Sequence, residues 1–308
     1  MNIVNNNTLI IFNIMGMFSW IGKKVEKKYK FYTIRDKYKT YDELHKDLKK
    51  SGLESSQLIF GIDYTKSNRW NGEKTFKNQC LHEISSGAKN PYQNAIEVAC
   101  RMLEPFDDDN QIPVFGFGDS RTTDKAVFPF FPDGRSCNGI REVLSRYNEI
   151  TPSIKLSGPT NFAPIIYASI ELVKRTCQYH ILVIIADGQV TNRDETQQAI
   201  IDASDYPISI IVIGVGDGPW EEMKKYDDSL PTRKFDNFQF VCFSDVMKRK
   251  NVENYDLELA REMMMEIPEQ YSAIKKLNLI NKCKAESNGV GMIACSEDVV
   301  HPPEYKDV

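Results

Sequence analysis

The sequence predicts an α/β protein with a doubly wound, mostly parallel central sheet and helices on both faces. Apolar strand patterns alternate with helical patterns along the chain, an order typical of parallel strands joined by crossover helices. The central strands also lack polar alternation: in Tyr179–Ala186, seven of eight residues are apolar, aromatic or Ala, as expected for a strand buried on both faces. Residues 53–272 show no repeat and no linker, which indicates one domain.

The first half of this domain begins with a helix and a buried strand. Thr40 opens a capping-box pattern, which predicts a helix over about 41–51. Pro91 is typical of a first helical turn and predicts a second helix over about 91–105. Strands are predicted at 58–63, 112–117 and 127–131. The last of them is expected at a sheet edge, because a proline interrupts it.

The second half repeats the alternation of helices and strands. Helices are predicted at 138–147, 163–174, 194–204 and 254–267, and strands at 179–186, 208–213 and 238–243. The final helix is expected to stop before a proline. The organisation that follows is an N-terminal segment over 1–39, a domain over 40–272, and a loose, polar C-terminal tail over 273–308.

Charge and cysteine content restrict the class of protein. The net charge of −4 argues against a general nucleic-acid binder, so no nucleic-acid partner is expected. Seven dispersed cysteines without a C-x-x-C pair indicate reduced thiols and exclude a structural zinc site of the usual spacing. These features predict a cytoplasmic location, with membrane-associated or nuclear pools as the alternatives.

The N-terminal segment differs from the rest of the chain. Residues 8–21 are largely apolar but too interrupted to span a bilayer. Residues 21–50 carry eleven Lys and Arg against five Asp and Glu, a balance of +6. An apolar strip followed by a basic stretch predicts peripheral contact with anionic membranes through about residues 8–30.

Oxygen-bearing side chains follow the predicted strands. The first strand ends in Asp63, and Thr65 and Ser67 follow at alternate positions. Asp187 comes directly after the most apolar strand, and a loop that precedes a helix carries Thr160. Ligands of open parallel sheets bind beyond the carboxyl ends of the strands, so these segments are expected to converge at one edge.

Carboxylates and hydroxyls are hard donors, which suit Mg²⁺, Mn²⁺ or Ca²⁺ better than zinc or copper. A site with two carboxylates and three hydroxyls leaves room for water, and an ion with few direct anionic ligands keeps net positive character. Such an ion would attract a carboxylate from a partner. Each segment alone is a weak signal, because Ser or Thr after a strand is commonly a helix cap, but the three together predict a divalent-metal site.

A set of longer motifs carries a family resemblance. They read IDYTKSN at 62–68, FGFGD at 115–119, GPTNFAP at 158–164, IADGQ at 185–189, GVGDGPW at 214–220 and FDNFQFV at 235–241. In this order they resemble the von Willebrand factor A domain of copines. They are closer still to the related domain of plant RING-type ubiquitin ligases of the copine-like group. The resemblance covers about 40–272.

The resemblance implies a doubly wound sheet with a metal-ion-dependent adhesion site. Carried over residue by residue, Asp63, Thr65 and Ser67 form the first motif, Thr160 is the hydroxyl of the second loop, and Asp187 is the last acidic member. The chain departs from these two groups of relatives in one respect each. Copines carry two calcium- and lipid-binding domains ahead of this one, which we do not expect here. A RING needs eight Cys and His ligands, and beyond residue 272 only Cys283, Cys295 and His301 are present.

The leading hypothesis is therefore a non-catalytic module that binds an acidic residue of a protein partner through a divalent cation. One alternative is an adaptor, or a truncated relative of a ubiquitin ligase, in protein ubiquitination; ligase activity would then require a RING supplied elsewhere. The other is a nucleotide-dependent enzyme, because Gly214, Gly216 and Gly218 follow a strand. Their spacing is not G-x-G-x-x-G, which favours a tight turn.

Overall fold

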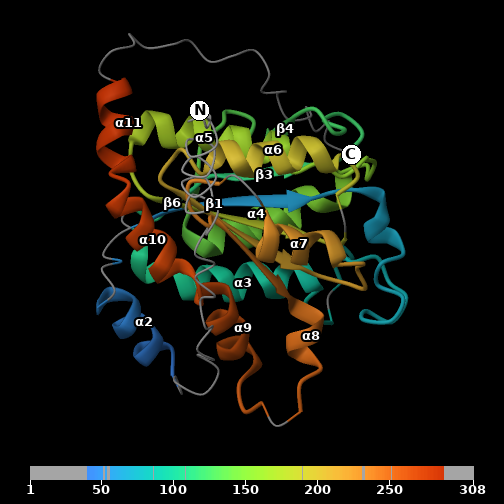
Figure 1. The fold of residues 1–308 in the computed structure, drawn as a ribbon. Coiled ribbons are helices and arrows are strands. Elements are labelled where there is room, and N and C mark those ends of the chain that lie inside the picture. Colours follow the sequence, from blue (N-terminus) through green and yellow to red (C-terminus); the bar gives the residue numbers. More distant parts are fainter. Residues whose placement is uncertain are drawn as a thin grey trace, which may run out of the picture. The chain divides into compact units, whose positions relative to one another are not determined.

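A six-stranded sheet forms the centre of the fold (Figure 1). The computed structural model describes residues 40–287, apart from 51–52, 54–55, 86, 108, 189, 231–232 and 251. The strand order is β4-β3-β1-β6-β7-β8. The strands are β1 (Gln57–Asp63), β3 (Val114–Phe117), β4 (Val127–Pro129), β6 (His180–Ala186), β7 (Ile208–Gly214) and β8 (Phe238–Cys242).

The connectivity of the sheet creates a switch point between β1 and β6. From β1 the chain moves outward through β3 to β4, then returns to the other side of β1 and moves outward again through β6, β7 and β8. Every neighbouring pair is parallel except β3 and β4. The doubly wound, mostly parallel sheet predicted from the sequence is confirmed, with β4 at an edge as expected.

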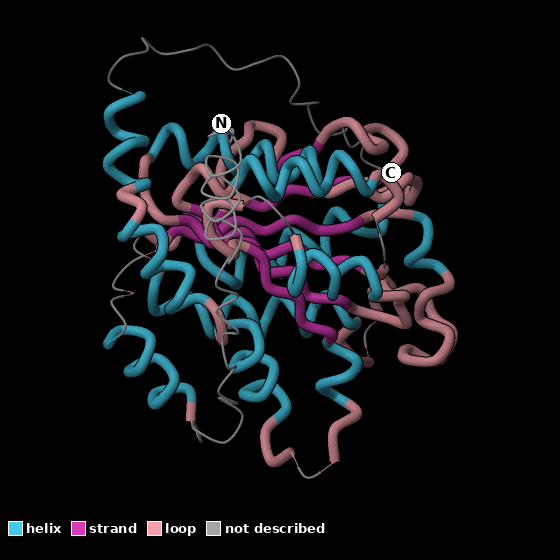
Figure 2. Tube along the Cα trace, in the orientation of Figure 1, coloured by secondary structure: helices cyan, strands magenta, loops and turns pink. Residues whose placement is uncertain are grey.

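Both faces of the strands are buried, which explains their lack of polar alternation. On β1, Leu58, Phe60 and Ile62 belong to one hydrophobic cluster, and the intervening Ile59 belongs to the other. Successive side chains of a strand point to opposite faces, so two separate cores are built from one continuous apolar run. Figure 2 shows helices on both sides of the strands.

The helices divide between the two clusters. Those that pack on the face of Ile59 are α5 (Ala163–Thr176), α6 (Arg193–Ala203) and α7 (Glu221–Ser229). Those that contribute to the opposite cluster are α2 (Tyr41–Lys50), α3 (Pro91–Leu103), α4 (Gly139–Ile150), α8 (Phe243–Met247), α9 (Tyr255–Met264), α10 (Ile267–Lys276) and α11 (Leu279–Ser287). Short 3₁₀ turns are η2 (Lys66–Arg69), η3 (Glu104–Phe106) and η4 (Thr151–Ser153).

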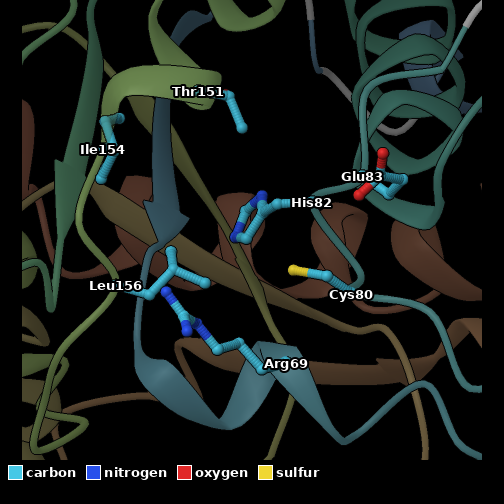
Figure 3. Close-up of a pocket in the computed structure, with 7 residues that line it drawn as sticks. All are labelled: Arg69, Cys80, His82, Glu83, Thr151, Ile154 and Leu156. Atoms are coloured by element: carbon cyan, nitrogen blue, oxygen red, sulfur yellow. The ribbon is translucent and has the colours of Figure 1, made fainter.

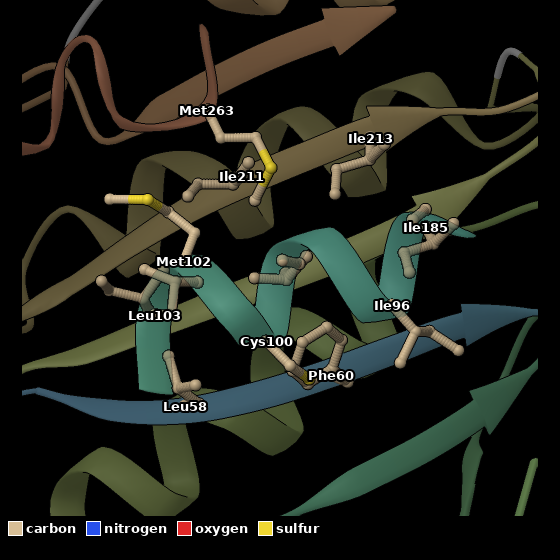
Figure 4. Packing of buried hydrophobic residues seen from close by; sticks show 14 of the residues in the cluster. Leu58, Phe60, Ile96, Cys100, Met102, Leu103, Ile185, Ile211, Ile213 and Met263 are labelled. Atoms are coloured by element: carbon tan, nitrogen blue, oxygen red, sulfur yellow. The ribbon is translucent and has the colours of Figure 1, made fainter. Parts of the chain in front are cut away.

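Helix α3 shows how the sequence pattern produces the packing. Asn90 caps its first turn in a capping box with Gln93, and Pro91 occupies the first turn. Ile96 and Cys100 recur at helical spacing and face the strands (Figure 4). The helix therefore buries one side against the sheet, as its periodicity predicts.

The predicted strand 112–117 is wrong in one respect, because it is two strands. Gln111–Ile112 is β2, which pairs antiparallel with β5 (Cys137–Asn138) in a separate two-stranded sheet. Pro113 separates β2 from β3. Proline has no backbone N–H to donate to a ladder, although its carbonyl oxygen still accepts from the N–H of Phe60 at 2.9 Å.

The C-terminal part of the described chain also differs from the expected organisation. The helix predicted over 254–267 ends at Met264, and Ile267 starts a new helix, α10, with a proline in its first turn. Residues 279–287, assigned to a loose tail, form α11, whose Leu279 and Cys283 are buried. The N-terminal segment 1–39 and residues 288–308 lie outside the described residues.

Within the described part of the chain, no helix has both the length and the apolar character needed to cross a membrane. The membrane contact predicted for residues 8–30 falls outside the described residues and stays a prediction.

Candidate metal centre

Two buried carboxylates meet at the switch point of the sheet. Asp63 is the last residue of β1, and Asp187 follows directly after β6, the neighbouring parallel strand. Because parallel strands end at the same edge, the topology alone places both side chains in one region. Asp63 is 0% exposed and Asp187 is 1% exposed, so both acids are removed from water.

Two residues, Thr65 and Ser67, connect these carboxylates. The backbone N–H of Thr65 donates to Asp63 Oδ1 at 2.7 Å, and the Thr65 and Ser67 hydroxyls lie 2.9 Å apart. Ser67 Oγ donates to Asp187 Oδ1 at 2.9 Å. Since the Ser67 proton is used on Asp187, the hydroxyl of Thr65 is the donor toward Ser67. Four of the five predicted site residues thus form one hydrogen-bonded chain.

Thr160 lies in a loop next to these four hydrogen-bonded residues. Its side chain is buried, and its backbone oxygen accepts from the N–H of Thr191 at 2.8 Å, on the segment after Asp187. The same loop is fixed to the first motif, because the N–H of Lys66 donates to Ser157 O at 2.5 Å. Among the described residues, the Thr160 hydroxyl makes no hydrogen bond to the other four site residues.

The structure adds two residues that the sequence did not single out. Asn71 Nδ2 donates to both the backbone oxygen and Oδ2 of Asp187, at 3.1 Å each, and so fixes the orientation of that carboxylate. Gly118, with φ at +79°, lies against Thr65: a Cβ at this position would come within 2.4 Å of Thr65 Cγ2. Only glycine permits this backbone approach without moving Thr65.

A buried histidine supports the backbone of Asp63. His82 Nε2 lies 2.7 Å from the Asp63 carbonyl oxygen, and its Nδ1 lies 2.8 Å from the Tyr147 hydroxyl. A carbonyl can only accept, so the proton is on Nε2 and Tyr147 donates to Nδ1. The ring stacks between Tyr64 and Tyr92, with centroids 4.7 and 4.0 Å away. Burial lowers the pKa of His82 to about 3, so the ring is neutral.

The two buried acids of the centre form an environment that is suited to a cation. Burial raises the pKa of Asp63 to about 6. The pKa of Asp187 is raised well above its usual range, first by burial and then by the charge of Asp63. In addition, Asp63 Oδ2 is buried without a hydrogen-bond partner. Buried charges in proteins are normally paired or bound to a metal, so two neighbouring acids and an orphaned oxygen fit a divalent cation.

The donor set indicates the kind of cation. The described residues contain no group of three or more His, Cys, Asp and Glu side chains arranged for a metal ion. The available ligands are therefore two carboxylates, Asp63 and Asp187, with the hydroxyls of Thr65 and Ser67 and of the adjoining Thr160. Oxygen-only sets of this kind suit Mg²⁺, Mn²⁺ or Ca²⁺.

The fold and the position of this centre define an α/β domain of the von Willebrand factor A class. A family model described as Copine matches residues 80–283. The chain is 48% identical over 272 residues to the E3 ubiquitin-protein ligase RGLG1 of Arabidopsis thaliana, covering 84% of this chain and 55% of that protein. It is 52% identical over 246 residues to Copine family protein 2 of Caenorhabditis elegans, covering 79% of this chain and 3% of that protein. The chain belongs to the copine family.

Two further comparisons concern lengths and solved structures. The chain spans about half the length of RGLG1 and a small share of the nematode copine family protein. Manganese-loaded Plasmodium vivax TRAP protein is similar with a TM-score of 0.43 and 13% identity, covering 63% of this chain and 70% of that one. The mussel byssus protein PTMP1 with a zinc-occupied MIDAS motif has a TM-score of 0.37 and 14% identity, covering 72% of this chain and 46% of that one.

Proposed function

We propose that the chain is a non-catalytic binding module in which a divalent cation, Mg²⁺ or its relatives Mn²⁺ and Ca²⁺, captures an acidic side chain of a protein partner. One observation carries the proposal: Asp63 and Asp187 are fully buried and are connected through Thr65 and Ser67, and one oxygen of Asp63 has no partner.

The composition of the centre explains why a partner's acid would be attracted. The hydroxyls add no charge, and a carboxylate that acts through water does not contact the ion directly, so an ion with few direct anionic ligands keeps positive character. An ion held this way keeps an affinity for further oxygen ligands. The nearby His82 is neutral and uses both ring nitrogens in structural hydrogen bonds, so it supplies no acid–base chemistry. These features support binding rather than bond chemistry.

Mn²⁺ is the direct probe of this proposal. We expect the full chain to bind one Mn²⁺, detected by loss of the free-ion electron paramagnetic resonance signal, and Asp63→Asn to lose this binding. The bound ion should broaden the aspartyl methylene proton signals of the peptide Ac-Gly-Asp-Gly-NH₂ more than the equivalent protons of Ac-Gly-Asn-Gly-NH₂. Asp194→Asn, an exposed change on α6, is the control and should behave as wild type. Equal broadening of the two peptides would contradict acid capture.

The free energy of unfolding should fall as pH rises when no metal is bound, and bound Mg²⁺ should reduce this dependence. The pKa of Asp63 is raised to about 6 in the folded chain, so the folded state binds more protons than the unfolded state between about pH 4 and 6. In chelator, this carboxyl therefore costs stability as pH rises through 6, by about 3 kcal/mol in full. With saturating Mg²⁺ the loss should be largely absent. Urea unfolding at pH 4 and pH 8, with and without Mg²⁺, measures most of this loss; the same pH dependence with and without Mg²⁺ would exclude the effect.

Ubiquitination is a second role, supported by the 48% identity to RGLG1. We propose that the chain acts there as a substrate- or partner-binding module. One of the few Cys and His residues beyond 272, Cys283, is buried in α11 and its Sγ donates to the Val173 oxygen at 3.5 Å. That thiol serves the core and is not presented as a zinc ligand. A ubiquitination assay with the chain alone, which should give no ubiquitin chains, distinguishes this role from ligase activity.

The glycine-rich loop does not support the nucleotide-dependent alternative. A Cβ at Gly216 would meet the Asn71 backbone oxygen at 2.6 Å, and one at Gly214 or Gly218 would meet the Trp220 ring at 2.8 Å. Trp220 is 9% exposed and fills the inside of the turn. The glycines therefore make room for protein atoms, and the tight turn expected from the spacing is the better interpretation.

A further inference from the structure

A cavity of about 410 Å³ opens beside the metal centre (Figure 3). Its lining includes Arg69 from η2, Cys80 and Glu83 from the following loop, and Ile154 and Leu156 from the segment after α4. Pockets of this size accommodate side chains or small ligands. His82, which supports the Asp63 backbone, also lines this cavity, so the cavity adjoins the centre described above without including its candidate ligands.

The cavity and the metal centre share backbone. Arg69 belongs to the same 3₁₀ turn as Ser67, two residues further on. Leu156 is followed by Ser157, which pairs with Thr65 and accepts from the N–H of Lys66. The two sites are therefore neighbours on one edge of the sheet, and a short segment of a partner can reach both.

The charge at the cavity is positive on the side nearest the metal centre. The Arg69 guanidinium points into the cavity toward Leu156, and Glu83 stands on the opposite wall (Figure 3). Arg69 is exposed, as are Lys66 and Lys155 on the flanking segments, and none of the three has an ion-pair partner within the described residues. Three cations without partners are notable in a chain of net charge −4.

We propose that this cavity is a second subsite of the same interface, in which Arg69 binds a second carboxylate of the partner segment, most simply that of a glutamate. The methylene groups of that side chain would pack on the half-exposed Ile154 and Leu156. Guanidinium and carboxylate form paired, charge-assisted hydrogen bonds, which give direction as well as attraction. The partner is therefore a protein segment with two acidic side chains, one for the cation and one for Arg69. This inference rests on the proposed function.

The spacing of the two acids follows from the geometry. A 3₁₀ turn rises about 2 Å per residue, so the backbones of Ser67 and Arg69 are close, and the long arginine side chain adds most of the separation. An extended partner advances about 3.3 Å per residue. The second acid should thus lie about two to four residues from the metal-bound acid.

A phage-displayed peptide library tests the inference. The library carries a fixed central Asp with four randomised positions on either side, is selected on the full chain in Mg²⁺, and is eluted with chelator. Wild type should enrich Asp or Glu two to four positions from the fixed residue. Arg69→Glu should instead enrich Lys or Arg there, and Lys276→Glu, the same charge change on α10, should keep the acidic preference.

The outcomes separate the two proposals. For a selected synthetic peptide, Arg69→Ala should lower the affinity about fivefold at low salt and less at high salt, while Mg²⁺ still stabilises the variant. An unchanged acidic preference in Arg69→Glu, or enrichment of apolar residues at that position, overturns the second subsite and leaves metal-dependent capture standing. Failure to recover any chelator-eluted peptide overturns the proposed function, and the subsite with it.

Discussion

Replacing Asp187 with Asn is expected to abolish stabilisation by Mg²⁺. A ligand at 100 times its dissociation constant stabilises the folded state by about 2.7 kcal/mol, which is roughly 5–10 °C in Tm for a domain of this size. Asp187→Asn keeps the shape of the side chain and can still accept from Asn71, but it removes one of the two buried charges. The wild type should show the Tm increase and the variant should show none.

The same substitution should raise stability when no metal is present. In chelator at neutral pH, wild type carries two neighbouring buried acids whose pKa values are both raised, so ionisation of the pair opposes folding. The neutral amide relieves this repulsion, and we expect Asp187→Asn to unfold at a higher temperature than wild type in chelator. Thermal unfolding with chelator and with Mg²⁺ measures both effects. A variant that still gains stability from Mg²⁺ would contradict the assignment of Asp187.

His82→Ala is expected to produce the largest loss of stability, about 3–5 kcal/mol. The substitution leaves a cavity between Tyr64 and Tyr92, removes the shortest of the donors to the Asp63 carbonyl, and removes the acceptor for Tyr147. Since that carbonyl belongs to a predicted metal ligand, the affinity for Mg²⁺ should also fall. Urea unfolding measures the first effect, and Mn²⁺ titration measures the second.

His45→Ala provides the matched control for this variant. His45 is half-exposed on α2, and within the described residues its side chain donates from Nε2 to the Met102 oxygen at 2.9 Å, so its removal should cost about 1 kcal/mol and leave metal affinity unchanged. The pH dependence gives an independent readout. The pKa of His82 is lowered to about 3 when folded, so its contribution is present above about pH 6.5 and is lost as pH falls. In Mg²⁺, His82→Ala should lack this slope, and an unchanged slope would contradict the buried, neutral histidine.

The strands of the sheet could be predicted from the sequence, because a strand that is buried on both faces is a continuous apolar run. β1, β6, β7 and β8 are mostly apolar runs, and their bounds are close to those predicted. The polar helix α7 was missed, because Met223 and Tyr226 are the only buried side chains among those of its residues whose burial the structure describes. Its helical period is carried by too few apolar side chains to be recognised.

Some residues of the candidate centre could likewise be predicted from the sequence, and others could not. Asp63, Thr65 and Ser67 were found because their alternation lies within one short segment after a strand. Asn71 and His82 were missed, since each acts through a contact that exists only after folding: Asn71 reaches Asp187, and His82 reaches back to the Asp63 backbone. No local spacing distinguishes such residues from ordinary loop residues. Pro113 is different, because its missing N–H could have indicated the break between β2 and β3.

The short edge strand β4 limits how a second polypeptide can attach to this sheet. It has three residues, runs antiparallel to β3 and ends at Pro129, which offers no amide proton to an incoming chain. Binding of an extended partner segment as an additional strand of the sheet is therefore disfavoured at the β4 edge. The recognition proposed here instead uses the connecting segments at the carboxyl ends of the central strands, where a change of one side chain can alter preference without disturbing the sheet.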